Sequence, residues 1–245
     1  MRRLEPVIWS KGTFLHPQHL QIQDRFLENV LRFQLDALVF RPWGFGSLQI
    51  DQENLEAGLF ALSAASGIFP DGLLFSIPDS DPAPEMKLLA DSFEPDQQSM
   101  DVYLAVPDYN ERGLNVSGPQ RGASTRYRSE YETFRDENTG FSEKHVQVAR
   151  KNFRILVEGE AREGSSALRV ARVLRTPAGT YALDPRFVPP LVNIGASDYL
   201  ISIARRLVEI LSTRSSSLAG MRRQKNQTLA DFTARSEEHT SELQS

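Results

Sequence analysis

Residues 43–77 read WGFGSLQIDQENLEAGLFALSAASGIFPDGLLFSI, in which three short apolar or alternating runs are separated by turn residues. The runs at 46–51, 58–66 and 73–77 have the length and composition of β-strands. Pro70-Asp71-Gly72 favours a tight turn between the last two, because glycine adopts positive φ without steric cost. No crossover helix separates the runs, so we expect the strands to pair antiparallel.

The same pattern continues as far as residue 175. Five further runs are strand candidates, at 102–106, 127–134, 145–148, 153–157 and 168–174. Turn residues at 79–84 and at Asp108-Tyr109-Asn110 indicate loops. About eight strands at this spacing predict a mainly β (α+β) protein, with an antiparallel β-sandwich or barrel.

An amphipathic helix is predicted before the strands, over residues 17–38. Pro17 suits the first helical turn, where its missing N–H costs nothing, and Arg41-Pro42 ends the helix. Eight apolar side chains recur at helical spacing, which predicts that the helix is buried: Leu20, Phe26, Leu27, Val30, Leu31, Phe33, Leu35 and Leu38.

A second, longer helix is predicted after a proline-containing connector at 176–196, with Ser197 as its N-cap and its end near Thr233. Its apolar residues have the 3-4 spacing of a coiled-coil seam, which Arg214 and Ser217 interrupt. Such a helix is about 54 Å long at 1.5 Å per residue, so its stripe needs other helices to cover it. The stripe consists of Leu200, Ile203, Leu207 and Ile210, followed by Leu211, Leu218 and Met221.

The last eleven residues, 235–245, read RSEEHTSELQS and break this apolar spacing. They look like the in-frame translation of a sequencing-library adapter, and we interpret them as a non-native tail. On that interpretation the natural protein continues beyond Ala234, and the sequence is a fragment.

Composition excludes several classes of protein. The 245 residues contain 28 basic and 32 acidic side chains, a net charge of −4, which gives no reason to expect nucleic acid as a partner. The absence of cysteine excludes disulfides, a thiol nucleophile and a thiolate zinc site.

Residues 57–70, a charge-free run, are too few to cross a bilayer. The N-terminus lacks the apolar core of a signal peptide, so the cytoplasm is the expected compartment.

Motifs for enzymatic chemistry are also missing. The sequence has no nucleophile elbow and no phosphate-binding loop, and Gly44-Phe45-Gly46 follows a helix instead of preceding one. His16 and His19 could share a helix face and bind a metal, but no third ligand is close in sequence. The favoured alternative is that both hydrogen-bond around the helix N-terminus. Asp79-Ser80-Asp81 lacks the glycine and terminal glutamate of a calcium loop and is interpreted as a turn.

Residues 126–132, RYRSEYE, mix basic and aromatic side chains as a nucleic-acid groove does. Glu130 and Glu132 cancel that charge, which favours a strand with cross-strand ion pairs on a solvated face. We find no catalytic set, no cofactor or metal site and no small-molecule site, and the protein is not expected to be an enzyme. A carbohydrate-active sandwich would need a spaced carboxylate pair, which no spacing here suggests.

Five segments in order resemble the TssK family, the baseplate proteins of bacterial type VI secretion systems. The first is residues 7–19, VIWSKGTFLHPQH, which leads into the first helix. The others follow along the chain: PWG at 42–44, FPDG at 69–72, VYLAVP at 102–107 and FVPP at 187–190. The resemblance covers residues 7 to about 230, and the C-terminal half of the family has no counterpart here.

The resemblance implies a non-enzymatic homotrimer with a β-sandwich shoulder, a helical neck and a C-terminal head. Residues 1–193 would be the shoulder and residues 194–234 the first neck helix. The shoulder would hold the TssF–TssG wedge, and the absent head would dock on the membrane complex that includes TssL and TssM. The protein would act in the cytoplasm, at the inner face of the inner membrane.

Two sets of residues follow as candidate interfaces. Leu200, Ile203, Leu207 and Ile210 of three copies could form a trimer seam around a threefold axis. Trp9, Phe14, Leu15, Gln18 and His19 are candidates for the wedge contact, since aromatic anchors contribute strongly to interfaces. The alternative is that Phe14 and Leu15 are a staple packed on the helix they precede. A phage tail or receptor-binding protein with the same sandwich remains the alternative function.

Overall fold

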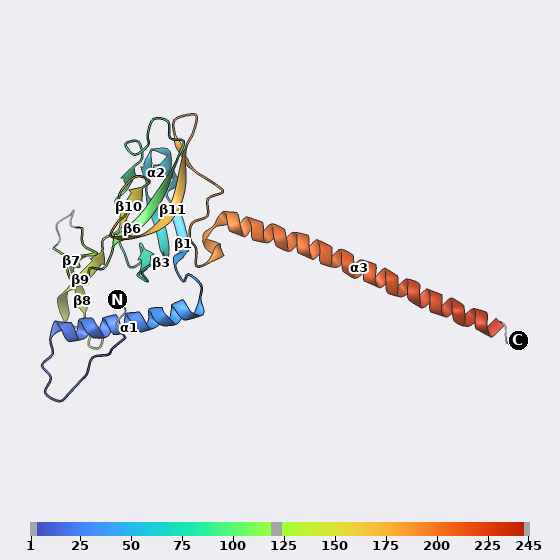
Figure 1. Cartoon of the computed structure of the whole chain (residues 1–245), viewed down its shortest axis with the longest axis horizontal. Coiled ribbons are helices and arrows are strands. Elements are labelled where there is room, and N and C mark those ends of the chain that lie inside the picture. The colour runs from blue at the N-terminus through green and yellow to red at the C-terminus, as the bar shows by residue number, and fades with distance from the viewer. Residues whose placement is uncertain (1–3, 119–123, 243–245) are drawn as a thin grey trace. The chain divides into compact units, whose positions relative to one another are not determined.

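The computed structural model describes residues 4–118 and 124–242. The chain divides into two compact units, Met1–Ser197 and Asp198–Ser245, which we describe separately (Figure 1). All strands of the described residues belong to the first unit, and one helix makes up the second.

The first unit begins with helix α1, Pro17–Leu38, whose bounds are those predicted from the sequence. All eight predicted runs overlap strands. The elements that the pattern missed are too short to show a period: helix α2 (Gln52–Glu56), β5 (Lys87–Leu88), β7 (Val116–Ser117), β12 (Tyr181–Leu183) and the 3-10 turn η1 (Ile194–Ala196). The remaining strands are β1 (Gly44–Ile50), β2 (Leu59–Phe60), β3 (Leu62–Ile68), β4 (Leu74–Ile77), β6 (Ser99–Pro107), β8 (Tyr127–Arg135), β9 (Glu143–Lys151), β10 (Arg154–Val157) and β11 (Ser165–Arg175).

Two antiparallel sheets share one core, so the predicted antiparallel sandwich with an N-terminal helix is confirmed. One sheet has the order β1-β3-β4 and the other β10-β6-β11-β12. β6 is central and almost continuously buried, as expected for a strand covered on both faces. The core joins both sheets through large side chains that are nearly inaccessible, among them Phe45, Phe69, Phe75, Val102, Leu104, Phe153 and Leu168.

The position of Gly44 explains the PWG motif at residues 42–44 in physical terms. Its φ is +134°, and an added Cβ would lie 2.7 Å from the backbone of Pro190 and Leu191. The connector therefore runs against the start of β1, where Phe45 donates its N–H to Pro190 O at 2.8 Å and accepts from Val192 N at 3.0 Å. This backbone contact fixes the end of the first unit on the sandwich.

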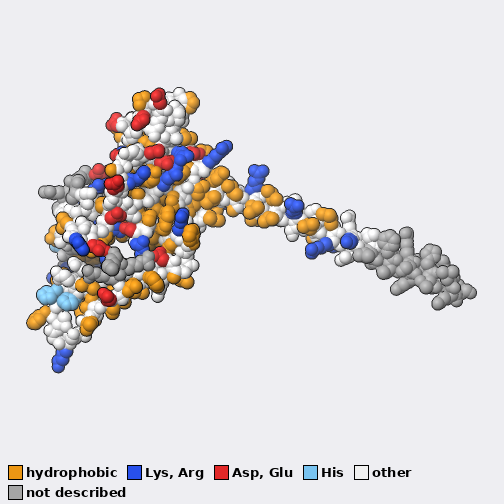
Figure 2. Space-filling view, in the orientation of Figure 1, with side chains coloured by type: hydrophobic (Ala, Val, Ile, Leu, Met, Phe, Trp, Pro, Cys, Tyr) orange, Lys and Arg blue, Asp and Glu red, His pale blue; other side chains and the backbone are white. Residues whose placement is uncertain are grey.

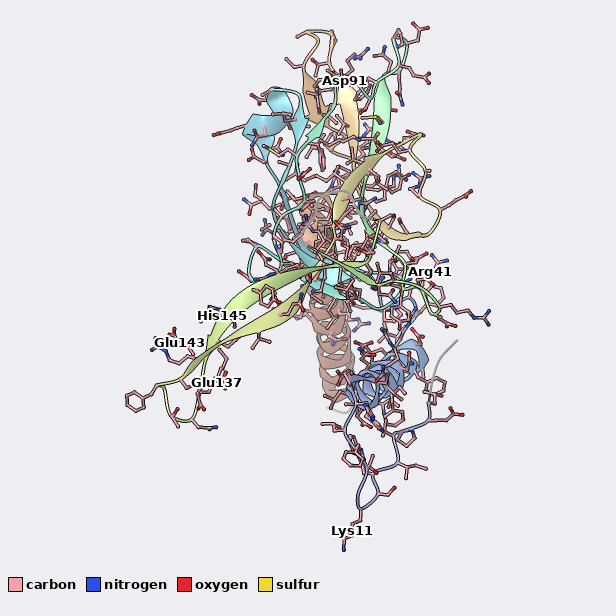
Figure 3. All side chains as sticks on the ribbon, turned by 90° about the vertical axis from the view of Figure 1, so that its left-hand side faces the viewer. Lys11, Arg41, Asp91, Glu137, Glu143 and His145 are labelled. Atoms are coloured by element: carbon pink, nitrogen blue, oxygen red, sulfur yellow. The ribbon has the colours of Figure 1, made fainter. Side chains whose placement is uncertain are left out.

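Strands β8 and β9 form a hairpin that extends away from the sandwich, with Glu137 and Glu143 toward its tip (Figure 3). They pair antiparallel over nine residue pairs, while the short strand β7 joins β8 in parallel. Arg150 of β9 binds both Glu130 and Glu132 of β8 at 3.1 Å. The prediction of a solvated strand with cross-strand ion pairs is therefore confirmed.

The prediction that α1 is a buried helix is wrong. Within Pro17–Leu38 no residue is buried, and all five leucines of the helix are at least 45% exposed. A helical period shows that a segment has an apolar side but leaves open what covers that side. In this unit the helix is fixed largely through arginine contacts, which the following subsection describes.

The second unit is helix α3, Asp198–Glu242. It begins directly after Ser197, as predicted, but continues past the expected end near Thr233. The reason is local: residues 221–242 contain neither glycine nor proline, so the altered apolar spacing at 235 does not stop the helix. The origin of residues 235–245 as an adapter-derived tail stays a prediction. Among the helices of the described residues, none is long and apolar enough to cross a membrane.

Candidate protein-binding surface

The start of α1 is organised by its two histidines. His16 is the N-cap with extended backbone, and Pro17 is the first helical residue. The backbone N–H of His16 donates to Nδ1 of His19 at 3.1 Å, and His19 N–H donates to His16 O at 3.0 Å. The two imidazole rings stack with centroids 5.8 Å apart. The alternative in which both histidines hydrogen-bond around the helix N-terminus is therefore confirmed.

Trp9 joins this cluster, and its ring centroid lies 6.2 Å from that of His19. The indole is nevertheless 56% exposed. The structure thus brings together Trp9 and His19 of the five candidate contact residues. Histidine side chains gather at one end of the helix in the space-filling view (Figure 2).

Phe14 and Leu15 stand apart from that cluster. Their exposed fractions are 85% and 61%, and Gln18 is exposed as well. A staple would cover these side chains with the helix that follows, but they are largely open to solvent. The N-terminal loop that carries them ends in a tip marked by Lys11 (Figure 3). Residues 9–15 are therefore an exposed aromatic and aliphatic segment attached to the rigid start of α1.

Two arginines fix α1 to the sandwich. Arg32 donates to Pro70 O at 2.8 Å and also to Asp71 O, the carbonyls of the turn between β3 and β4. Arg25 lies over the ring of Tyr109, 3.9 Å from its centroid. Gly72 of the same turn has a φ of +90°, so the FPDG motif supplies the tight turn to which the helix is attached.

Arg126, which sequence reasoning missed as an anchor, holds that turn from the other side. Its Nη2 lies 2.6 Å from Oδ2 of Asp71, and its Nη1 donates to Pro107 O at 2.9 Å. Burial by itself lowers the pKa of the Arg126 guanidinium, but the negative charge of Asp71 and the hydrogen bonds raise the pKa above its ordinary value. The side chain stays charged while only 5% of its surface is exposed.

The sequence predicted strands β8 and β9, but it did not predict that their hairpin extends away from the sandwich. Tyr131 and Phe141 are 72% and 96% exposed, and both faces of β9 are largely open. The available signal was the sequence of β9, EKHVQVARK, which lacks the continuous apolar run of a core strand.

The seam residues of α3 lie on one side of that helix. Ile203, Leu207 and Ile210 are each about half exposed, at 46–53%, and Leu200 is half-buried. The stripe is thus available for contact along the part of the helix whose side chains are described. The basic side chains Arg205, Arg206 and Arg214 accompany it.

The acidic turn predicted at Asp79-Ser80-Asp81 has a structural role. Oδ2 of Asp81 accepts from Ser76 N at 3.0 Å and lies 2.9 Å from Nζ of Lys151 at the base of the hairpin. Among the side chains that the structure describes, no group of three His, Asp or Glu could hold a metal ion.

Comparison with known proteins shows the family of the chain. Residues 19–244 match the model of the bacterial type VI secretion family named VasE, ImpJ and EvfL. The chain is 35% identical over 223 residues to the type VI secretion system baseplate component TssK1 of Pseudomonas aeruginosa. The chain belongs to the TssK family. The matched range includes residues 235–244 of the suspected tail.

Solved structures of TssK proteins have the same fold. A chain of the TssK–TssF–TssG baseplate subcomplex is 26% identical, with a TM-score of 0.82 over 90% of this chain and 73% of that one. A crystal structure of TssK is 29% identical, with a TM-score of 0.76 over 89% of this chain and 49% of that one. The present chain spans about half the length of the curated TssK1, at 48%.

Proposed function

We propose that this chain is a structural, non-enzymatic baseplate component of a type VI secretion system. The observation that carries the proposal is the 35% identity to a curated baseplate component along 87% of this chain. The surfaces of the described residues agree with it: exposed apolar side chains of the N-terminal segment, α1 and the hairpin are suited to protein contacts.

The partner proposed for the first unit is the TssF–TssG wedge. Support comes from the similarity to a chain of a TssK–TssF–TssG subcomplex. Trp9, Phe14, Leu15, Gln18 and His19 are the proposed contact residues. Large apolar side chains presented on a fixed framework are typical interface anchors, and the stacked histidines supply that framework for Trp9.

Replacing Trp9 with alanine is expected to reduce capture of TssF–TssG without changing the stability of the chain. The indole is more than half exposed, so its removal opens no core cavity. Pull-down of co-produced TssF and TssG by the tagged chain measures capture, and thermal unfolding measures stability. The matched control is Phe141→Ala, which removes an exposed aromatic ring at the far hairpin tip. A Trp9→Ala protein that captured the wedge normally would contradict the assignment.

A homotrimer is proposed for the seam of α3, because a half-exposed apolar stripe with coiled-coil spacing is stabilised by copies of itself. Leu207→Asp places a charge in that seam and is expected to shift the chain from trimer toward monomer in sedimentation velocity. Val208→Asp is the control, since Val208 is 66% exposed but points about 100° away around the helix. Equal sedimentation of the Leu207→Asp and Val208→Asp proteins as trimers would remove the seam from the proposal.

Docking on the membrane complex of TssL and TssM is assigned to the half of the family that this sequence does not span. The proposed place of action is the cytoplasm, at the inner face of the inner membrane. Sequencing the genomic region around the coding sequence tests the whole assignment. Neighbouring genes for a sheath and TssL support a secretion system, whereas genes for capsid and terminase would favour a phage tail or receptor-binding protein.

A further inference from the structure

Helix α1 carries apolar side chains on both of its sides. The side toward the sandwich holds half-buried Ile22, Phe26 and Val30, next to the anchoring Arg25 and Arg32. The opposite side carries the outer leucine stripe, which we define as Leu20, Leu27, Leu31 and Leu38. The sandwich covers only one of these two apolar sides, so the outer side is available to a partner.

The outer leucine stripe is open along its whole length. The four side chains are between 50% and 81% exposed. At 1.5 Å per residue the stripe runs for about 27 Å along the helix. Apolar side chains lie along the lower edge of the space-filling view, where Figure 1 draws α1 (Figure 2).

The spacing of the stripe indicates the shape of its partner. Its members are separated by seven, four and seven residues, which places all four at seam positions of a heptad repeat, with polar Asp24 and Gln34 at the two seam positions between them. A straight seam of this kind fits a second helix whose own apolar side chains insert between the leucines. Because the arginine contacts hold α1 from behind, the seam is presented on a fixed support.

The charged residues near the stripe indicate what kind of helix the partner is. Exposed Asp24 lies between Leu20 and Leu27 on the stripe, whereas Glu28 at its flank is already paired with Arg25 at 2.8 Å. Arg25 pairs with Glu28 and lies over Tyr109, and Arg32 binds the turn and lies 4.0 Å from Asp36. Parallel copies of α1 around a symmetry axis would bring their Asp24 carboxylates together, which is unfavourable. A different helix with Lys or Arg beside its apolar face would pair with the Asp24 carboxylate instead.

We propose that the outer leucine stripe is a second docking site, which binds an amphipathic helix with a basic rim provided by the TssF–TssG partner. This inference rests on the proposed function and extends it from the N-terminal segment to the outer side of α1. The N-terminal segment leads directly into this helix, so the two surfaces are continuous along the chain.

Capture of co-produced TssF and TssG by the full chain tests the docking site. Leu31→Asp is expected to weaken binding by about tenfold or more, the loss typical of a central interface residue. Asp24→Lys is expected to weaken it as well, because a repulsive charge replaces a complementary one. Ala37→Asp is the control: Ala37 is exposed on α1 but lies away from the stripe. Thermal unfolding of each variant verifies that the chain still folds.

A photo-crosslinking residue at Leu27 identifies the occupant. The expected result is a crosslink to a helical segment of TssF or TssG with basic residues. A crosslink to a second copy of this chain would overturn the inference, and so would normal capture by Leu31→Asp. Both of those outcomes leave the proposed function intact if the unmodified chain captures TssF–TssG. Failure of the unmodified chain to capture them would overturn the proposed function, and the docking site with it.

Discussion

Replacing Phe69 with alanine is expected to lower the free energy of unfolding of the first unit by about 3–5 kcal/mol. Phe69 follows β3, is fully buried and stacks on Phe153, which precedes β10, with centroids 5.8 Å apart. It also lies 5.0 Å from the ring of Phe75 in β4. The side chain therefore joins the two sheets, and its removal leaves a cavity that the sheets cannot close without moving together.

Urea unfolding followed by circular dichroism measures the loss, and Phe141→Ala is the control. Phe141→Ala removes the same aromatic ring at a position that is 96% exposed. The urea midpoint of this variant should therefore change no more than it does for ordinary surface substitutions. If the two variants unfolded at the same urea concentration, the aromatic contact would not be part of the core.

The strands and the first helix were predictable because their signals are local. Apolar runs between turn residues marked eight strands, and Pro17 and Arg41-Pro42 bounded α1. Short elements escaped the pattern for the same reason, because elements of two to five residues show too little of a period. Helix α3 continues after residue 234, although its apolar stripe has ended by then. An apolar pattern therefore does not predict where this helix ends, because a segment without glycine or proline can remain helical on backbone preference alone.

Burial depends on contacts between distant segments and could not be predicted in this way. The period of α1 was correct, yet the leucines that define it face away from the sandwich. What fixes the helix is a contact between Arg32 and a turn 38 residues later in the chain, which no local pattern contains. The hairpin of β8 and β9 is similar, since its strands were predicted but its extension beyond the sandwich was not.

The candidate contact residues were predictable in part. The sequence placed an aromatic segment before a histidine cap, and the structure brings Trp9 to His19 while leaving Phe14 exposed. An interface anchor is exposed to solvent, whereas a staple is covered by its helix. The exposure of a side chain cannot be deduced from a single sequence. The anchoring role of Arg126 was obscured because it lies at the start of a strand rich in both charges.

Arg126 connects three segments that are far apart in the sequence. Arg126 directly precedes β8 of the hairpin, and it binds Asp71 in the turn after β3 and Pro107 O at the end of β6. Arg32 of α1 binds the same turn through Pro70 O and Asp71 O. The turn is thus held between an arginine of the hairpin and an arginine of the helix.

Replacing Arg126 with methionine is expected to lower the free energy of unfolding by about 3 kcal/mol. The substitution keeps much of the length of the side chain but leaves Asp71 without its cation and Pro107 O without its donor. Removing one partner of a buried pair costs more than the pair contributes, because the remaining charge stays desolvated. Chemical denaturation of the purified variant measures the loss.

The control is Arg135→Met, which removes an arginine from an exposed pair with Glu143 and should change stability by less than about 1 kcal/mol. Because the turn also holds Arg32, Arg126→Met should in addition increase hydrogen exchange in α1, while Arg135→Met should not. Faster exchange in α1 at unchanged exchange in β6 would show that the turn transmits the effect. Unchanged exchange in α1 would mean that Arg25 and the half-buried side chains hold the helix without the turn.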